Sequence, residues 1–341
     1  MNRCIQLARL GMGEVAPNPM VGAVIVHNDK IIGEGFHRQY GGPHAEVNAV
    51  NAVKDQSLLS ESTIYVSLEP CAHFGKTPPC SDLIISHRIP HVVVGSVDPF
   101  AEVAGKGIEK MRKAGIRVDL GVLGEECLEL NRRFFTFHQQ KRPYVILKWA
   151  QTLDGFLDRD RILAGCGKPN WISNELSRRL VHRQRTEEAA ILIGTNTALK
   201  DNPSLTVRDW DGKQPVRMAL DRSNRLPDHL QIKDGRVPTV IFTEKEVSPD
   251  TNTAYVQLDF AGQIVPQILQ FLYNRQLQSV VVEGGRQLLQ SFIDHDLWDE
   301  AHVYIGNNWF GAGVEAPRLV ALPSVSEMLD DTRLEVFYRK S

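Results

Sequence analysis

Short apolar runs alternate with amphipathic ones between residues 21 and 140, which is the pattern of alternating strands and helices. The runs TIYVSLE (63–69) and HVVVGSV (91–97) flank the helical stretch SDLIISH (81–87) and predict a parallel strand–helix–strand unit. Further strands are expected at 21–28, 30–36 and 116–122, and helices at 45–53, 107–115 and 124–140. We therefore expect an α/β fold with helices on both faces of a central mixed sheet.

The second half of the chain repeats this pattern with more extended runs. Strands are expected at 144–151, 189–195, 215–221, 238–244, 254–259, 279–285 and 301–307, and helices at 174–189, 264–275 and 286–294. Pro143 follows the polar end of the helix at 124–140 and disfavours helical backbone in the residue before it. The pattern thus predicts two domains, 1–143 and 144–341, which is also what a length of 341 residues favours.

Charge and hydropathy exclude several classes of protein. The 39 basic and 41 acidic residues give a net charge of −2, so no global basic field attracts nucleic acid. The longest apolar runs have the length of strands, far below the ~18 residues of a membrane span, and MNRCIQLARLGMGE (1–14) lacks the pattern of a signal peptide. We expect a cytoplasmic homo-oligomer that binds neither nucleic acid nor membrane.

His44, Cys71 and Cys80 indicate metal chemistry. One imidazole and two thiolates suit tetrahedral zinc and leave a fourth position for water, as in catalytic sites. Glu46, two residues after His44 at the start of a predicted helix, can pass a proton from water to a departing amine, which predicts hydrolytic deamination. The pattern is similar to the zinc deaminase signature, but eight residues separate the cysteines. The alternative is an acidic helix start and two buried thiols.

Four further residues of the first domain suit a ligand. His73 and Lys76 lie between the cysteines and could donate to a phosphate or a ring carbonyl, although a solvated loop is the alternative. Asn18 could pair with the edge of a base. Asp98 follows the strand at 91–97, where ligands gather, but aspartate before proline is also ordinary turn chemistry.

The second domain has no G-x-G-x-x-G after a strand, so a dinucleotide would need another cradle. Gly284 and Gly285 lie between a strand and a helix and could receive a pyrophosphate, or form only a tight turn. Thr197 follows a second strand–glycine junction. Among the arginines of the helix at 174–189 we expect at least one pair to face solvent, and we assign Arg185 and Arg208 to a phosphate clamp.

Four segments of the first domain resemble the deaminase half of the bifunctional riboflavin-biosynthesis deaminase/reductases. They are PNPMVGAVIV (17–26), PHAEVNA (43–49), SLEPCAHFGKTPPC (67–80) and DPFAEVAGKGI (98–108). The longer cysteine spacing is that family's own form. The resemblance implies a cytidine-deaminase-like domain with zinc held by His44, Cys71 and Cys80, Glu46 as proton shuttle, and a small-molecule phosphoribosylaminopyrimidine substrate that loses an amino group.

The second domain resembles the reductase half of the same family, which is similar to dihydrofolate reductase. The segments are YVILKWAQTLDG (144–155), NWIS (170–173), GTNTALKDNPSLTVR (194–208) and VVEGG (281–285). The resemblance implies NADPH as cofactor and reduction of a ribosyl group to ribityl. By this resemblance, Trp171, Thr197 and Asp201 would line the NADPH site, and Arg185, Leu205, Arg208 and Glu283 would face the substrate. Our further candidates for NADPH binding are Gln151, Arg222, Gly284 and Gly285.

Lys148 is our candidate for polarising the sugar carbonyl or imine, and a lysine that lies along a strand edge with its amine in water is the alternative. The segment AGCGKPNW (164–171) departs from the family's usual Ser-Gly-Glu-Ser loop. Arg222 stands where a smaller serine is usual and could meet the extra phosphate of NADPH.

Two other functions share parts of this pattern. One is a zinc deaminase of nucleosides or tRNA, against which the charge near zero argues. The other is a deaminase whose C-terminal domain binds a nucleotide without catalysis. NADPH oxidation in the presence of the deaminated intermediate separates the second from a working reductase.

Overall fold

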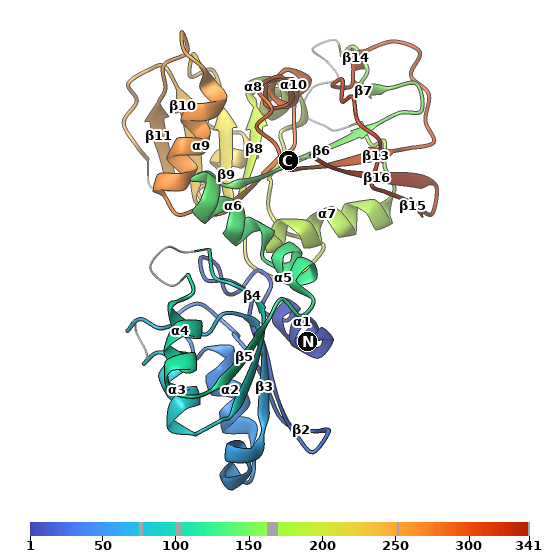
Figure 1. Cartoon of the computed structure of the whole chain (residues 1–341). Helices are drawn as coiled ribbons and strands as arrows, with labels where there is room; N and C mark the ends of the chain where they lie inside the picture. The colour runs from blue at the N-terminus through green and yellow to red at the C-terminus, as the bar shows by residue number, and fades with distance from the viewer. Residues whose placement is uncertain (75–77, 100–103, 162–169, 251, 340–341) are drawn as a thin grey trace. The chain divides into compact units, whose positions relative to one another are not determined.

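The computed structural model of the chain describes residues 1–74, 78–99, 104–161, 170–250 and 252–339. Within these ranges the chain divides into two compact units, Met1–Lys141 and Arg142–Ser341 (Figure 1). The predicted substrate residue Lys76 lies outside the described residues, as does most of the segment 164–171. No helix of the described ranges is long and apolar enough to cross a membrane.

The first unit is built on a mixed sheet, which in the part of the chain described has the strand order β2-β1-β3-β4-β5. The strands are β1 (Gly22–His27), β2 (Lys30–Phe36), β3 (Thr63–Leu68), β4 (His91–Ser96) and β5 (Arg117–Leu120). β1 pairs antiparallel with β2 and β3, whereas β3, β4 and β5 run parallel. The predicted parallel unit around residues 63–97 and the mixed sheet are therefore confirmed.

Helices cover both faces of this sheet. They are α1 (Asn2–Arg9), α2 (Ala45–Ala52), α3 (Cys80–Ser86) and α4 (Lys106–Lys113), with a 3-10 turn at Gln56–Glu61. Ile25 and Ile64 pack with α2, α3 and α4 on one face, and Val24 packs with α1 on the other. The alternation of side chains along β1 thus feeds two apolar layers, which gives the predicted three-layer arrangement.

The predicted single helix at 124–140 is wrong, because the structure divides it into α5 (Gly124–Leu130) and α6 (Arg132–Gln140). Asn131 separates the two helices. Its side-chain oxygen accepts a hydrogen bond from the Met20 backbone N–H at 2.8 Å, and its amide donates to the Met20 carbonyl at 2.8 Å. These long-range bonds hold the Asn131 backbone outside the helical region, at φ −109° and ψ 23°.

The second unit contains a larger mixed sheet, whose described strands have the order β11-β10-β9-β8-β12-β6-β13-β16-β15. The strands are β6 (Tyr144–Gln151), β8 (Ala190–Gly194), β9 (Val216–Leu220), β10 (Thr239–Thr243), β11 (Thr253–Gln257), β12 (Ser279–Val282), β13 (Glu300–Ile305), β15 (Val325–Leu329) and β16 (Thr332–Tyr338), and β7 (Phe156–Asp158) pairs separately with β14 (Val314–Glu315). The strands from β11 to β13 in this sheet order, which include β10, β9, β8, β12 and β6, all run parallel. At the other edge, β16 pairs antiparallel with both β13 and β15.

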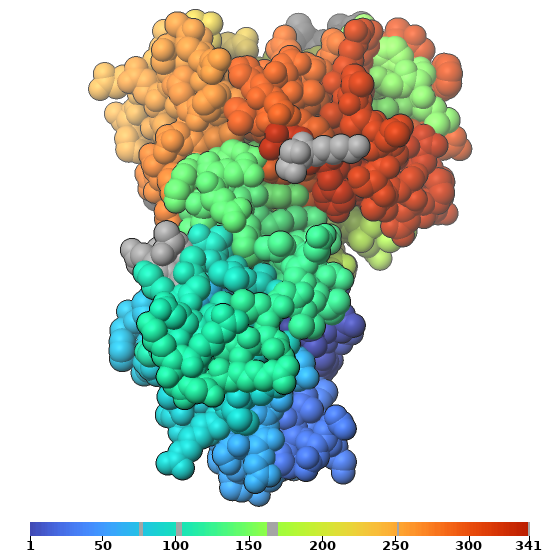
Figure 2. Space-filling model, viewed as in Figure 1, coloured from blue at the N-terminus to red at the C-terminus, as the bar shows by residue number. Residues whose placement is uncertain are grey.

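The helices of the second unit are α7 (Glu175–Glu187), α8 (Thr195–Asp201), α9 (Ile264–Asn274) and α10 (Arg286–Asp294), with a 3-10 turn at Gln231–Lys233. α9 and α10 bury their apolar faces against one side of the sheet, and α8 packs on the other. Side chains fill the spaces between the ribbons of this unit (Figure 2). Because β6, β8, β9 and β12 are parallel, their carboxyl ends share one edge, where ligands gather in such sheets.

Candidate active sites

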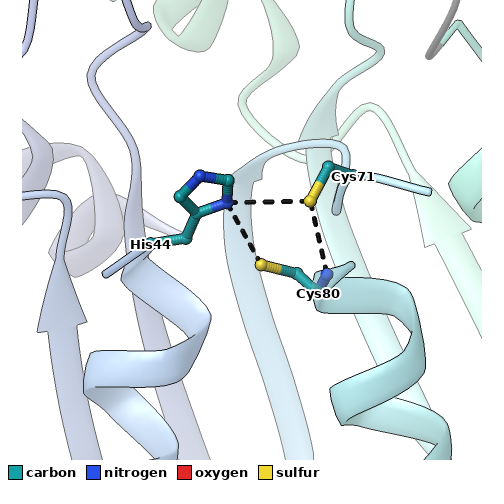
Figure 3. Close-up of side chains that lie close together, drawn as sticks. All are labelled: His44, Cys71 and Cys80. Carbon is teal, nitrogen blue, oxygen red and sulfur yellow. Dashed lines mark hydrogen bonds between the residues drawn. The ribbon is translucent and has the colours of Figure 1, made fainter. Parts of the chain in front are cut away.

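The three predicted metal ligands meet at the edge of the first sheet (Figure 3). His44 is the residue before α2, Cys71 follows β3, and Cys80 is the first residue of α3. His44 Nδ1 lies 3.6 Å from Cys71 Sγ and 3.3 Å from Cys80 Sγ, and the three ligand atoms lie within 4.8 Å of one another. One imidazole nitrogen and two sulfur atoms in this arrangement fit the donor set of a tetrahedral zinc site with one open position.

Glycine in β2 allows α2 to approach closely enough to place His44 there. A Cβ atom built on Gly35 would lie 2.3 Å from the Ala49 nitrogen and 2.5 Å from the Ala45 carbonyl oxygen. Distances that short do not occur for a real Cβ, so any larger residue at position 35 pushes the helix away from the sheet. The run KIIGEGF (30–36) therefore contributes to the metal site by packing rather than by a ligand.

The backbone around the two cysteines is held by hydrogen bonds. The Cys80 backbone N–H donates to Cys71 Sγ at 3.3 Å, and the Ser81 N–H donates to the Cys71 carbonyl at 3.1 Å. Hydrogen bonds from Cys80 and His44 lower the pKa of Cys71, and the hydrogen bond to Cys71 raises the pKa of His44. The thiolate form that a metal requires is thus favoured at Cys71.

Glu46 lies in the first turn of α2, and its side chain is buried, with 3% of its surface exposed. Burial and the neighbouring Cys71 together raise the pKa of Glu46 to about 7, although the charge of His44 partly opposes them. A carboxyl group with a pKa near neutrality can both accept and release a proton at physiological pH, which is the property that a proton shuttle needs.

The predicted residue Asn18 reaches the site through a second histidine. Asn18 Nδ2 donates to His37 Nε2 at 3.0 Å, and His37 Nδ1 donates to the Pro43 carbonyl at 3.0 Å. The His37 ring stands edge-on to the His44 ring, with centroids 5.5 Å apart. Burial lowers the pKa of His37, which agrees with a neutral ring that accepts on one nitrogen and donates on the other.

The other predicted residues of the first unit differ in burial. The His73 side chain is exposed in the segment between the cysteines, whereas Asp98 is buried after β4. β3 and β4 are parallel neighbours, so Cys71 and Asp98 follow the carboxyl ends of adjacent strands. The structure therefore places Asp98 at the same sheet edge as the metal ligands.

Glu69 connects this edge to α4. One carboxylate oxygen accepts hydrogen bonds from the backbone N–H groups of Gly107 at 2.9 Å and Ile108 at 3.3 Å, and the other from Gly105 at 2.9 Å and Asp98 at 3.3 Å. The side chain is 4% exposed. A single buried carboxylate thus satisfies the first turn of a helix and fixes the backbone of Asp98.

In the second unit, Arg185 and Glu283 form a buried ion pair. Arg185 Nε and Nη2 donate to the two carboxylate oxygens of Glu283 at 3.1 and 3.0 Å, and Nη1 donates to the Thr206 carbonyl at 3.0 Å. The charges of Arg185 and Lys148 outweigh burial and lower the pKa of Glu283 to about 2. Burial lowers the pKa of Lys148, whose Nζ lies 5.6 Å from the centre of the Tyr304 ring. The structure thus brings Lys148, Arg185 and Glu283 together.

Arg208 and Leu205 lie in the segment 204–209 beside this pair. The Arg208 guanidinium donates to Ser204 Oγ, and burial together with the charge of Arg185 lowers its pKa. Leu205 is buried and has a positive φ of 55°. The other arginines of α7 behave as expected: Arg179 and Arg183 are exposed and pair with acids on their own helix, which confirms a solvent-facing pair.

The predicted glycine cradle lies at the carboxyl ends of β8 and β12. The Gly194 N–H donates to the Gly284 carbonyl at 2.7 Å, and Gly284 has a φ of 120°, which favours glycine. A Cβ atom on Gly285 would lie 3.2 Å from Thr197 Oγ1, so the absence of a side chain keeps this junction open. Thr197, Gly284 and Gly285 therefore lie together, as a phosphate cradle requires.

The remaining predicted NADPH residues are distributed around the same sheet edge. Gln151, at the end of β6, accepts a hydrogen bond from Trp149 Nε1 at 2.7 Å. Asp201 pairs with Arg161 at 2.7 Å, and Arg222, which follows β9, pairs with Glu244 at 2.8 Å and is largely exposed. Trp171 is 59% exposed, and the Arg178 guanidinium lies 5.4 Å from its ring centre.

Sequence reasoning missed four residues that organise these sites, namely His37, Glu69, Arg161 and His182. Glu69 stands next to Pro70 in the quoted segment 67–80, so its position was visible but its partners were not. His182 precedes Arg185 by three residues on α7, a spacing that places both on one helix face. That spacing is the one signal in the sequence that could have identified it.

Comparison with known proteins assigns both units. Residues 1–96 match the cytidine and deoxycytidylate deaminase zinc-binding region, and residues 143–339 match the RibD C-terminal domain. The chain is 41% identical over 334 residues to the riboflavin biosynthesis protein RibD of Aquifex aeolicus, covering 96% of this chain and 92% of that protein. It is 33% identical over 348 residues to RibD of Escherichia coli, covering 97% of this chain and 92% of that protein.

Solved structures agree over the full length. A diaminohydroxyphosphoribosylaminopyrimidine deaminase/5-amino-6-(5-phosphoribosylamino)uracil reductase from Thermotoga maritima has a TM-score of 0.89 at 39% identity, covering 99% of this chain and 97% of that one. Acinetobacter baumannii RibD has a TM-score of 0.88 at 30% identity, covering 100% and 98%. These full-length matches do not favour a deaminase with a non-catalytic C-terminal domain. The chain belongs to the RibD family, the bifunctional deaminase/reductases of riboflavin biosynthesis.

Proposed function

We propose that residues 1–143 catalyse zinc-dependent hydrolytic deamination of a diaminopyrimidinone that carries a phosphoribosylamino group. Residues 144–341 then reduce the ribosyl group of the deaminated product to ribityl with NADPH. The observation that carries the proposal is the convergence of His44, Cys71 and Cys80 near the buried carboxyl of Glu46. The similarity to the Thermotoga maritima diaminohydroxyphosphoribosylaminopyrimidine deaminase supports the substrate class.

In the deaminase site, His44, Cys71 and Cys80 would hold zinc, because their nitrogen and sulfur atoms match its preferred donors. Zinc would act there as a Lewis acid that lowers the pKa of water. Glu46 would accept a proton from the attacking water and deliver it to the departing amino group, so that water is consumed and ammonia is released. The exocyclic amine of the ring is thereby replaced by a carbonyl oxygen.

Substrate binding in this unit is assigned to Asn18, His73, Lys76 and Asp98. The assignment of Asn18 is supported by its hydrogen bond to His37, because the His37 ring lies edge-on to the ring of His44. The assignment of Asp98 is supported by its position after the carboxyl end of β4, next to the strand that leads to Cys71. A phosphate or ring carbonyl of the substrate would accept hydrogen bonds from His73 and Lys76.

In the reductase site, NADPH supplies the hydride. We assign its phosphates to the cradle of Thr197, Gly284 and Gly285, and the rest of its surface to a second group of residues. That group contains Gln151, Trp171, Asp201 and Arg222. The open junction at Gly285 supports the cradle, because a side chain there would crowd Thr197.

The substrate of the reductase faces Arg185, Leu205, Arg208 and Glu283, and Lys148 polarises the sugar carbonyl or imine that receives the hydride. Arg208 is the phosphate-binding cation in this proposal, because Arg185 is already paired with Glu283 through both carboxylate oxygens. The lowered pKa of Lys148 favours release of a proton to the substrate.

We also propose that the chain assembles as a homo-oligomer in the cytoplasm and does not bind nucleic acid. Val320 and Leu322 are 99% and 90% exposed, and Met328 of the edge strand β15 is 62% exposed, which supports a contact between copies. The four described cysteines are unpaired, as in a reducing compartment. Light scattering of the purified protein measures the mass of the assembly. A mass equal to that of one chain contradicts the homo-oligomer.

The function is tested in two steps with one preparation. Zinc-loaded protein is incubated with the diaminopyrimidinone ribotide without NADPH, and ammonia is measured. NADPH is then added, and its near-ultraviolet absorbance is followed. We expect ammonia first and NADPH oxidation second. Ammonia without oxidation contradicts the reductase assignment, and oxidation of NADPH by the undeaminated ribotide contradicts the order of the steps.

A further inference from the structure

The segment 204–209 has no helix or strand, yet side chains from elsewhere in the second unit hold its backbone. Arg217 Nη1 donates to the Ser204 carbonyl at 3.2 Å, and Arg185 Nη1 donates to the Thr206 carbonyl at 3.0 Å. Gln214 accepts from the Val207 N–H at 2.7 Å and donates to the Val207 carbonyl at 3.1 Å. The path of this segment is therefore fixed by the fold around it.

His182 of α7 completes this set of contacts at the position of Arg208. Its Nδ1 atom accepts hydrogen bonds from the backbone N–H groups of Arg208 at 2.9 Å and Asp209 at 3.3 Å. The ring is 2% exposed. Because both partners are donors, Nδ1 carries no proton. The neutral ring therefore carries its proton on Nε2, which lies 3.8 Å from a carboxylate oxygen of Asp209.

The backbone bond matters because the Arg208 side chain has a like charge nearby. Arg185 is close enough to lower the pKa of Arg208, and the side-chain partner that holds the Arg208 guanidinium is the neutral Ser204 hydroxyl. Repulsion between two guanidinium groups favours displacement of Arg208 away from Arg185 and toward solvent. A fixed backbone sets the position and direction of the Arg208 Cα–Cβ bond and so limits how far the guanidinium can be displaced.

We propose that His182 is a positioning residue of the reductase, which holds the Arg208 guanidinium toward the phosphate of the substrate through the Arg208 backbone. The inference rests on the proposed role of Arg208 in binding that phosphate. The proposed role belongs to the Nδ1 atom, which accepts the two backbone hydrogen bonds, so another acceptor at the place of Nδ1 should replace it.

Three substitutions test the position of the acceptor. His182→Asn puts an oxygen near the place of Nδ1, His182→Gln puts it near the place of Nε2, and His182→Ala removes it. We expect the reductase KM for the deaminated ribotide to rise about tenfold in the Gln and Ala variants, as for one lost hydrogen bond of about 1.4 kcal/mol, with a smaller change in kcat. The Asn variant should have a KM close to that of the unmodified chain.

Controls come from the same molecule. Ammonia release by the first unit reports the amount of zinc-loaded protein, and the urea midpoint of NADPH oxidation reports whether the second unit of each variant is folded. His229→Gln makes the same change at an exposed site of the second unit. Arg208→Ala should raise the KM, and adding His182→Gln to it should change the KM little further, because both act through one contact.

The outcomes separate the two proposals. No NADPH oxidation by the unmodified chain, or an unchanged KM in Arg208→Ala, overturns the assigned function of Arg208 and the inference with it. A raised KM in Arg208→Ala with unchanged values in His182→Gln and His182→Ala overturns the inference alone. Equal losses in the Asn, Gln and Ala variants also overturn it, because the ring would then matter for packing rather than as an acceptor.

Discussion

Glu69→Gln should lower the free energy of unfolding of the first unit by more than the loss of one surface hydrogen bond would. The glutamine keeps one oxygen and replaces the other by an amide, which cannot accept from the two backbone N–H groups that the lost oxygen serves. Each lost bond to a charged acceptor is worth about 1.5 kcal/mol, so two give about 3 kcal/mol. With a urea dependence of about 2 kcal/mol/M, the unfolding midpoint should fall by about 1.5 M.

The assay follows the two activities in parallel as urea is raised. Ammonia release reports the first unit, and NADPH oxidation with the deaminated ribotide reports the second. Only the midpoint for ammonia release should shift, and Glu61→Gln, at an exposed position of the same unit, should leave it in place. An unchanged midpoint for Glu69→Gln, or an equal shift in both activities, would show that the four contacts do not hold α4 as we argue.

Four other predictions follow from single features. Glu46→Gln should keep its zinc and its NADPH oxidation but lose ammonia release by a factor of about 10²–10⁴, measured by coupled assay, and near-normal release contradicts the shuttle. Removing zinc with a chelator should stop ammonia release and spare the reductase, and added zinc should restore it. Arg217→Lys should destabilise the second unit by about 3–5 kcal/mol in urea unfolding, because the lysine amine cannot replace the N–H donors that the buried guanidinium supplies to Gln231, Asp234 and Val237. Burial lowers the pKa of His182 to about 4, so the neutral ring stabilises the second unit above about pH 6.5, and this contribution is lost as the pH falls toward 4. The free energy of unfolding of the second unit should therefore fall by about 2 kcal/mol at pH 5. The His182→Asn variant should not show this loss.

The metal site was predictable because its residues come from short segments with a recognisable chemistry. His44 and Glu46 start one helix, and Cys71 and Cys80 bracket one loop, so local sequence carries most of the information. The role of Glu69 was not predictable, because its partners lie 29 to 39 residues further along the chain. The same holds for Asn131, which contacts Met20 across 111 residues and thereby interrupts a helix that the local pattern favours.

The reductase site was predictable only in outline. The parallel strands indicate the edge at which Glu283 and Gly284 lie, but Arg185 is brought there by a pairing across 98 residues. The edge strand β15 and its neighbour β16 were not predicted. β15 exposes most of its side chains and so lacks the alternation that marks a half-buried strand. Local periodicity therefore identifies buried elements better than edges.

The anchored segment 204–209 has a consequence for the entropy of ligand binding. Ordering the backbone of one residue costs about 1–2 kcal/mol of entropy, so six residues represent roughly 6–12 kcal/mol. Because Arg217, Gln214 and Arg185 already hold this backbone in the free chain, that entropy is lost when the protein folds and not when a ligand arrives. Calorimetry of ligand binding to the second unit should accordingly show a small unfavourable entropy for a site that is formed by a loop.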